Sequence, residues 1–452
     1  MKIWIKAVLV LLVAAVAWLA WQAGKVMPMG AAYIAKTMCS EHFVAGRDNL
    51  DDIWSDILDI DSSFTLGNYE LDTEASRVNG FFGPGLLKTT AVYREGLGCT
   101  IAAGGAPDSL LPLPPGQLAG VVSDQKLSVS GVRNPLLEAA LDEAFSEPSS
   151  ESHRQTRAVV VLQDGQIVAE RYAAPFDRET PLIGWSMTKS ITNNLLGLLA
   201  GDGHFDLDDP APVAEWQADD DPRKAITMRQ LLQMSSGLDF PEVYSPGSAT
   251  TNMLFTEPSA AAVAAAAPLG YEPGSRWYYS SGTSNILARI VWDMTGGTSA
   301  AVYEFTHRRL FYPLGITTML IEPDASGAPV GSSFSYATAR DWARLGQFWL
   351  QDGVWRGERL LPKGWMEWST EAAPAAAEGQ YGAQFWLNRE VEGKGRPSPE
   401  LPEPMFMAHG FNGQSVVVFP DQNIVVVRLG FTTDESWDLD AFLADVLAAL
   451  EL

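Results

Sequence analysis

The sequence predicts an α+β fold in which one antiparallel sheet is flanked by helices. Two observations predict this fold. Short β-rich segments occur near both ends of the region after residue 131, and helical segments fill the chain between them. The first two strands are joined by Asp164-Gly165, a dipeptide typical of a hairpin turn. The sheet is therefore expected to form from both ends of the domain, with helices packed on it. The expected strands are 158–163, 166–171, 415–419 and 424–429.

Composition favours a globular protein and excludes one class of partner. The chain has 452 residues, of which 46% are hydrophobic and 19% charged, and its formal net charge is −24. A core of useful size is therefore available, for one large domain with a smaller one or for two domains. Because no basic stripe is present to neutralise phosphates, nucleic acid is not an expected partner.

Residues 1–26 predict a signal or membrane anchor. Lys2 and Lys6 precede the stretch 7–23, which carries no charged residue. The flanking tryptophans favour an uncleaved anchor in the inner membrane, with the rest of the chain exported to the periplasmic side. The alternative is a signal peptide cleaved after 15–17, which would leave a secreted protein.

Residues 27–125 are expected to form an accessory segment. It contains the only two cysteines, Cys39 and Cys99. In an oxidising compartment the two would form a disulfide, and the alternative is two unpaired buried thiols. The expected elements of this segment are a helix at 51–60, strands at 64–71 and 91–94, and a Gly- and Pro-rich linker at 104–120.

Residues 126–452 are expected to form the main domain, in which the middle of the chain makes a helical subdomain. The expected helices are 135–145, 187–200, 228–234, 258–266, 284–295, 300–310, 338–351 and 439–450.

The stretch Ser186-Met187-Thr188-Lys189 contains a candidate nucleophile and base. On a helix, residues three apart share a face, so the Lys189 amine would lie within reach of the Ser186 hydroxyl. Burial and the positive end of the helix would both lower the pKa of Lys189 and favour a neutral amine. The same spacing recurs at Ser123 and Lys126, in a polar stretch that we interpret as surface.

Two further segments add candidate site residues. Tyr279 follows a Pro-Gly turn and an aromatic run, and a phenol beside a lysine can relay protons. His409 and Gly410 precede the strand 415–419, where glycines let a substrate approach closely. The five histidines form none of the usual metal-binding spacings, so no metal or other cofactor is expected.

Together these segments resemble the serine β-lactamase and penicillin-binding-protein family, in particular class C β-lactamases and related esterases. The stretches 203–210 and 226–238 also resemble segments of that branch, and the resemblance spans about 131–450. It implies a β-lactamase-like fold in which Ser186 forms an acyl-enzyme and Lys189 and Tyr279 share the acid–base work. It also implies an oxyanion hole made by the Ser186 N–H and by the chain near 412–415.

Departures from the family pattern bear on the substrate. Tyr279-Ser280-Ser281 replaces the usual Tyr-x-Asn, and His409-Gly410-Phe411 is not a clean match to Lys-Thr-Gly or His-x-Gly. Ser281, His409, Gly410 and Asn412 are the expected substrate-binding residues. The Tyr-x-Ser form is similar to that of carboxylesterases and 6-aminohexanoate-dimer hydrolases.

Three functions follow from these observations. The first is a serine hydrolase acting on an ester or small linear amide, whose partner is a small-molecule substrate. The second is a D-peptidase or β-lactamase of the same fold. The third is a non-catalytic binding module, against which the intact Ser186, Lys189 and Tyr279 argue.

Overall fold

A seven-stranded sheet forms the centre of the main domain in the computed structural model, which describes residues 11, 24, 26–83, 87–114, 127–149 and 152–450. Its strand order is β13-β14-β15-β16-β6-β7-β5, and all neighbours are antiparallel except the parallel pair β5 and β7. β16 pairs with β6, so the two ends of the domain meet as predicted. The strands are β5 Ser128–Val129, β6 Thr156–Gln163, β7 Gln166–Tyr172, β13 Trp386–Leu387, β14 Phe406–Gly410, β15 Gln414–Phe419 and β16 Ile424–Gly430.

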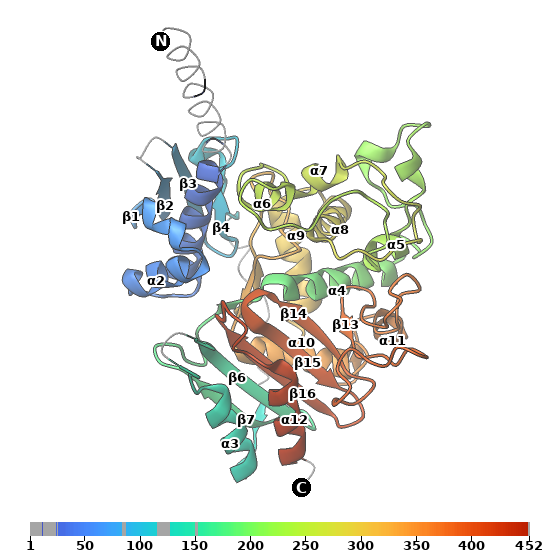
Figure 1. Cartoon of the computed structure of the whole chain (residues 1–452). Helices are drawn as coiled ribbons and strands as arrows, with labels where there is room; N and C mark the ends of the chain where they lie inside the picture. Colours follow the sequence, from blue (N-terminus) through green and yellow to red (C-terminus); the bar gives the residue numbers. More distant parts are fainter. Residues whose placement is uncertain are drawn as a thin grey trace.

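Helices cover both faces of this sheet. α10 (Ala339–Leu350) packs on one face, where a Cβ at Gly346 would lie only 2.4 Å from Val425. α3 (Pro135–Ala144) and α12 (Leu439–Leu450) cover the other face (Figure 1). Side chains alternate between the faces along each strand, which is why the central strands are rich in valine along their whole length.

Helices α5 to α9 form a second layer beyond α4 (Thr188–Gly201), which lies between them and the sheet, whereas α11 lies beside β13 (Figure 1). The predicted helices 187–200, 284–295 and 338–351 each lie within a few residues of an observed helix, while α6 was not predicted. The other helices here are α5 Met228–Leu232, α6 Ala249–Phe255, α7 Ala260–Ala265, α8 Ser281–Met294, α9 Ser299–Thr306 and α11 Trp365–Ser369. Two small sheets join β8 Leu182–Ile183, β10 Ser335–Ala337 and β9 Leu320–Ile321, and β11 Val354–Trp355 with β12 Glu358–Arg359.

The accessory segment has its own four-stranded antiparallel sheet, in the order β1-β2-β3-β4. Residues 26–39 are helical and pack across it, and Gly80 permits this contact because a Cβ there would lie 2.1 Å from the Ala31 carbonyl oxygen. The predicted strand 64–71 is partly wrong, since a 3₁₀ turn occupies 62–66 and capping by Asp61 starts it. The elements are α2 Leu50–Ile60, β1 Gly67–Asp72, β2 Arg77–Phe82, β3 Leu87–Arg94 and β4 Gly98–Ile101.

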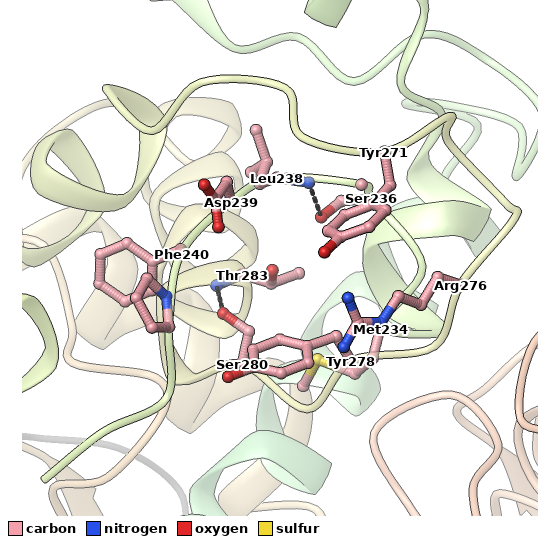
Figure 2. Close-up of a pocket in the computed structure, with 12 residues that line it drawn as sticks. Met234, Ser236, Leu238, Asp239, Phe240, Tyr271, Arg276, Tyr278, Ser280 and Thr283 are labelled. Atoms are coloured by element: carbon pink, nitrogen blue, oxygen red, sulfur yellow. Dashed lines mark hydrogen bonds between the residues drawn. The ribbon is translucent and has the colours of Figure 1, made fainter.

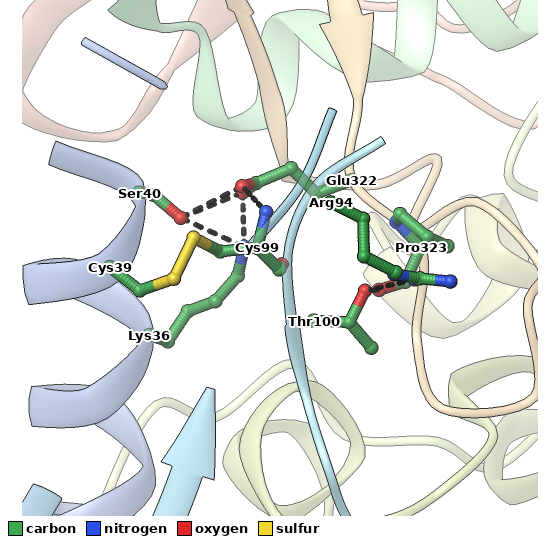
Figure 3. The surroundings of a disulfide bond; sticks show 8 residues. All are labelled: Lys36, Cys39, Ser40, Arg94, Cys99, Thr100, Glu322 and Pro323. Atoms are coloured by element: carbon green, nitrogen blue, oxygen red, sulfur yellow. Dashed lines mark hydrogen bonds and ion pairs between the residues drawn. A yellow bond between two sulfur atoms is a disulfide. The ribbon is translucent and has the colours of Figure 1, made fainter. Parts of the chain in front are cut away.

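A disulfide and a buried ion pair hold the accessory segment in place. Cys39 and Cys99 form a disulfide that joins the helix at 26–39 to β4 (Figure 3). Beside it, the Lys36 ammonium pairs with the carboxylate of Glu322, which follows β9 of the main domain. Ser40 Oγ and the Cys99 N–H also donate to Glu322, at 2.8 and 2.6 Å. The accessory segment is thus fixed to the main domain through a fully hydrogen-bonded buried carboxylate.

The predicted anchor at 7–23 lies almost entirely outside the described residues. Among the residues that the structure describes, no helix is long and apolar enough to cross a membrane.

Candidate active site

Ser186 lies in a one-turn 3₁₀ helix, Trp185–Met187, that leads directly into α4. Trp185 adopts φ +46°, a left-handed conformation that costs a bulky residue about 1–3 kcal/mol and is typical of functional sites. Gly184 permits this turn, because a Cβ there would lie 2.3 Å from the Trp342 ring. The packing of Gly184 therefore presents Ser186 at the N-terminal end of a buried helix.

Lys189 lies one turn further along, and its side chain is fully buried. Its Nζ is 2.9 Å from Ser186 Oγ, 3.1 Å from Ser281 Oγ and 3.0 Å from the Ser332 carbonyl oxygen. All three contacts are to uncharged oxygens. Burial lowers the pKa of Lys189 to about 8, although the nearby charge of Glu242 acts in the opposite direction. A substantial fraction of the lysine is therefore a neutral amine near pH 7–8.

Tyr279 lies next to both the Ser186 hydroxyl and the Lys189 amine. The Lys189 Nζ is 4.8 Å from the centroid of its ring, and its hydroxyl hydrogen-bonds with Ser186. The ring stacks on Trp386, with centroids 5.2 Å apart, and meets Tyr381 edge-on. Burial raises the pKa of Tyr279 well above its usual range. The phenol consequently stays protonated at neutral pH and can serve as a proton donor.

Ser281 begins α8 and lies beneath Lys189, fully buried. Its N–H donates to Glu242 at 2.8 Å and its hydroxyl donates to Glu242 at 2.5 Å. Tyr244 donates to the same carboxylate at 2.6 Å. Ser281 thus connects Lys189 to a carboxylate, and it is not among the residues that line the cavity described below.

Glu242 was not predicted from the sequence. It lies in an irregular loop, 39 positions from Ser281, and the only local signal was an acidic residue two positions before a tyrosine, Tyr244. Its N–H donates to the Tyr278 hydroxyl at 3.0 Å, which ties the loop to the segment that carries Tyr279.

His409 and Gly410 form the end of β14, next to the turn that carries Ser186. A Cβ at Gly410 would lie 2.3 Å from the Gly184 carbonyl oxygen, so only glycine permits this approach. Burial lowers the pKa of His409 to about 4, with a smaller contribution from Arg428, so its imidazole is neutral. Asn412 has φ +61°, and its side chain is buried. It does not line the cavity described below, whereas its neighbour Phe411 does.

A cavity of about 540 Å³ opens onto the Ser186 hydroxyl. Tyr279, His409 and Gly410 line it together with Ser186. Its size lies within the usual range for small-molecule sites. Much of the opposite wall is made by the accessory segment, including Tyr33 and Phe64 from residues before 83.

A second, smaller cavity of about 190 Å³ lies beside the segment 276–283 and shares no lining residue with the first (Figure 2). Arg276 lies along it, within 4.6 Å of the Tyr271 ring centroid. Ser186, Lys189 and Tyr279 do not line this cavity. The chemistry is therefore assigned to the first cavity.

In the part of the chain that the structure describes, no group of three or more His, Cys, Asp or Glu side chains is placed to hold a metal ion. The site consists of a hydroxyl, an amine of lowered pKa and a protonated phenol in mutual contact. That set is suited to nucleophilic attack on a carbonyl with proton transfer.

A comparison with protein families finds a match to the family model "Beta-lactamase" over residues 141–449. The match includes Ser186, Lys189, Tyr279 and His409 and leaves out the accessory segment.

Individual relatives include hydrolases from a bacterium and a fungus. The 6-aminohexanoate-dimer hydrolase of Paenarthrobacter ureafaciens is 25% identical over 338 residues, which cover 68% of this chain and 78% of the relative. A lovastatin esterase from Penicillium rubens is 32% identical over 120 residues, only 26% of this chain and 28% of the relative. The crystal structure of a family VIII carboxylesterase superposes with a TM-score of 0.55 at 16% identity, covering 72% of this chain and all of that one, which shows a shared fold.

Proposed function

This chain belongs to the beta-lactamase family, and on that premise we propose that it is a serine hydrolase that cleaves an ester or a small linear amide through an acyl-enzyme. The observation that carries the proposal is the contact between Ser186 and Lys189. Lys189 is fully buried, and burial lowers its pKa to about 8. A neutral amine 2.9 Å from a hydroxyl can accept its proton as the oxygen attacks.

In the first step Ser186 Oγ bonds to the substrate carbonyl carbon, and its proton passes to Lys189 Nζ. The carbonyl oxygen becomes an oxyanion, which the N–H of Ser186 and a backbone N–H from the chain near 412–415 would stabilise. The bond to the leaving group then breaks as the oxyanion collapses. In the second half-reaction water adds to the carbonyl carbon of the Ser186 ester and gives a proton to Lys189. The bond to Ser186 Oγ then breaks, the acid product leaves, and Oγ takes that proton back as the free hydroxyl.

The leaving group takes its proton from Tyr279 in this scheme. Burial raises the pKa of this phenol, so it is protonated at neutral pH and available as a donor, but the raised pKa also makes it a weaker acid that suits only a strongly basic leaving group such as an alkoxide or an amide nitrogen. The proton that Lys189 gained in the first step then returns to the phenoxide, and the Lys189 Nζ is 4.8 Å from the centroid of its ring. The lowered pKa of Lys189 favours it as the base, and the protonated state of Tyr279 leaves it as the donor.

The proposed substrate class rests on Ser281 and on the relatives. The Ser281 hydroxyl is engaged by Lys189, Glu242 and Tyr244, so it does not present a side-chain amide to the cavity as the usual Asn would. A 6-aminohexanoate-dimer hydrolase and a lovastatin esterase are among the relatives, which favours linear amides and esters over β-lactams.

A fluorophosphonate probe tests whether the chain is an enzyme. Ser186→Ala should abolish both labelling and hydrolysis. Ser123→Ala, the matched variant at the second Ser-x-x-Lys, should retain both. Labelling that persists in Ser186→Ala would assign the nucleophile elsewhere, and no labelling of the unaltered protein would favour the non-catalytic binding module.

The substrate class requires a separate comparison. Hydrolysis of p-nitrophenyl esters and of linear amides should exceed that of nitrocefin and of D-Ala-D-Ala peptides. The reverse ranking would support the alternative of a β-lactamase or D-peptidase.

Export across the inner membrane remains part of the proposal. The disulfide between Cys39 and Cys99 supports an oxidising compartment. Sequencing the N-terminus of the mature protein from fractionated cells would distinguish an anchored chain, which retains 7–23, from a cleaved and secreted one.

A further inference from the structure

One wall of the catalytic cavity comes from the accessory segment, outside the region that matches the family model. The helix at 26–39 contributes Met29 and Tyr33, and α2 contributes Ile60 at its last residue. Phe64 and Phe82 add two aromatic rings to this accessory wall, and Val26, Gly30, Asp61 and Ser63 line the cavity from the same segment. The side chains of Met29, Tyr33, Ile60, Phe64 and Phe82 are large and apolar or aromatic, and all except Ile60 are buried.

Aromatic contacts fix the accessory wall against the main domain. The Tyr33 ring stacks on Phe64, with centroids 5.1 Å apart, and meets Phe255 of α6 edge-on at 5.3 Å. Phe64 in turn meets Phe82 edge-on at 5.9 Å. The wall is therefore a preformed surface rather than a loose flap, since its rings are held in defined positions on both sides.

Most of the cavity lining between the accessory wall and the nucleophile is apolar or aromatic. Trp185, the residue before Ser186, lines the cavity and meets Phe411 edge-on, with centroids 5.8 Å apart. Among the lining residues only Asp61 carries a formal charge, since His409 is neutral, and Asp61 is exposed. An apolar group bound here would thus be desolvated along its length while its carbonyl reached Ser186.

We propose that the accessory segment is a substrate-binding element that takes a long apolar chain, so that the preferred substrate is an ester of a medium-chain or long-chain acid or alcohol. The inference rests on the proposed hydrolase function and deepens it. An acetyl group would leave most of the 540 Å³ cavity unfilled, and each further methylene of an apolar chain would cover more of its apolar and aromatic lining.

Chain length provides the first test. Each methylene that leaves water should raise kcat/KM by about fourfold, so burying three of the six methylenes that separate octanoate from acetate gives about 60-fold. The measurement compares p-nitrophenyl acetate with p-nitrophenyl octanoate for an acyl-side chain, and ethyl acetate with octyl acetate for an alcohol-side chain. A preference of this size in either series supports the proposal and identifies the side.

A paired substitution assigns the preference to the accessory wall. Ile60→Gln places an amide in the wall at a partly exposed position and should lower the octanoate-to-acetate ratio of kcat/KM about tenfold. Leu66→Gln is the matched control, because Leu66 is 64% exposed, lies in the same segment and does not line the cavity. Met29→Gln, nearly isosteric, repeats the test if Ile60→Gln melts at a lower temperature than the parent protein.

The outcomes separate this inference from the function on which it rests. If all the esters are hydrolysed at similar rates, or if Leu66→Gln and Ile60→Gln change the ratio equally, the chain-binding role is overturned and the hydrolase stands. If none of the esters is hydrolysed and Ser186 does not label, the proposed function itself fails.

Discussion

Among the residues that the structure describes, two buried lysines have closely similar surroundings, and we propose a role as base for only one of them. Lys36 in the accessory segment and Lys189 in the main domain are 4% and 1% exposed. Each lies within 3.1 Å of a serine hydroxyl on its own helical segment, Ser40 or Ser186. Each also lies beneath an aromatic ring, Phe334 at 4.5 Å or Tyr279 at 4.8 Å.

The difference between the two sites is the position of a carboxylate. Glu322 contacts the Lys36 ammonium directly, whereas Glu242 contacts Ser281 and reaches Lys189 only through it. Burial lowers the pKa of Lys36 as well, but Glu322 opposes that shift by pairing with the ammonium directly, so Lys36 serves as a structural link. At the other site, the Ser281 hydroxyl lies between Lys189 and Glu242. Lys189 therefore has only neutral hydrogen-bond partners, and burial favours its unprotonated form. A Ser–Lys contact alone therefore does not identify a catalytic site.

Removing each amine should separate the two roles most clearly. Lys189→Met should lower kcat/KM by about 10⁴-fold, because Ser186 loses the group that accepts its proton. Lys189→Arg should be nearly as inactive, since a guanidinium cannot be deprotonated in this range. Steady-state kinetics and circular dichroism would check both. Retention of activity in the Arg variant would exclude Lys189 as the base.

Lys36→Met should instead weaken folding. The change leaves Glu322 buried without its cation, which costs about 3–5 kcal/mol of unfolding free energy. The double variant Lys36→Met/Glu322→Leu should recover most of this loss, because no unpaired charge remains. Denaturant unfolding measures both, and the pH dependence of kcat/KM should not change. If the double variant is no more stable than Lys36→Met, the ion pair contributes more to the unfolding free energy than the burial of its two charges costs.

The two aromatic rings provide a smaller contrast. Tyr279→Phe keeps the ring over Lys189 and removes only the hydroxyl, so kcat/KM should fall about 10²-fold while the melting temperature is preserved. Phe334→Leu, over Lys36, should lower the unfolding free energy by about 1–2 kcal/mol and leave the chemistry intact. Substrates with a good leaving group, such as p-nitrophenolate, should be the least sensitive to Tyr279→Phe, since they need no proton.

The contacts of the proposed catalytic set could be predicted from the sequence where the signal is local. Ser186 and Lys189 are one helical turn apart, so short-range spacing predicted their contact, whereas Tyr279 is 90 positions from Lys189 and was singled out with them through the resemblance to the family. The central sheet was also predictable, since its valine-rich strands 158–163 and 424–429 are strongly patterned. β14 was not predicted as a strand because Ala408-His409-Gly410 has weak strand propensity. The strand forms through its pairing with β15.

Glu242 and the accessory wall could not be predicted for a different reason. Glu242 acts through contacts to residues 36 and 39 positions away, which leave no periodic signal. In the accessory segment, Gly80 lies within β2, where the absence of a side chain lets a helix pass close by, and a glycine there weakens the strand pattern in the sequence. Both features are set by tertiary packing, which overrides local propensity.

The smallest expected effect concerns the position of Glu242. Only a neutral Lys189 can accept the Ser186 proton, so kcat/KM should rise with pH, level off above about pH 8 and fall tenfold per unit well below it. Because the charge of Glu242 raises the pKa of Lys189, Glu242→Gln should move the midpoint of this profile to lower pH. Asp239→Asn, a carboxylate in the second cavity, is the matched control and should leave the midpoint in place. A midpoint that moves to higher pH in Glu242→Gln would mean that the carboxylate assists deprotonation through Ser281, and the contrast between the two buried lysines would then rest on more than charge.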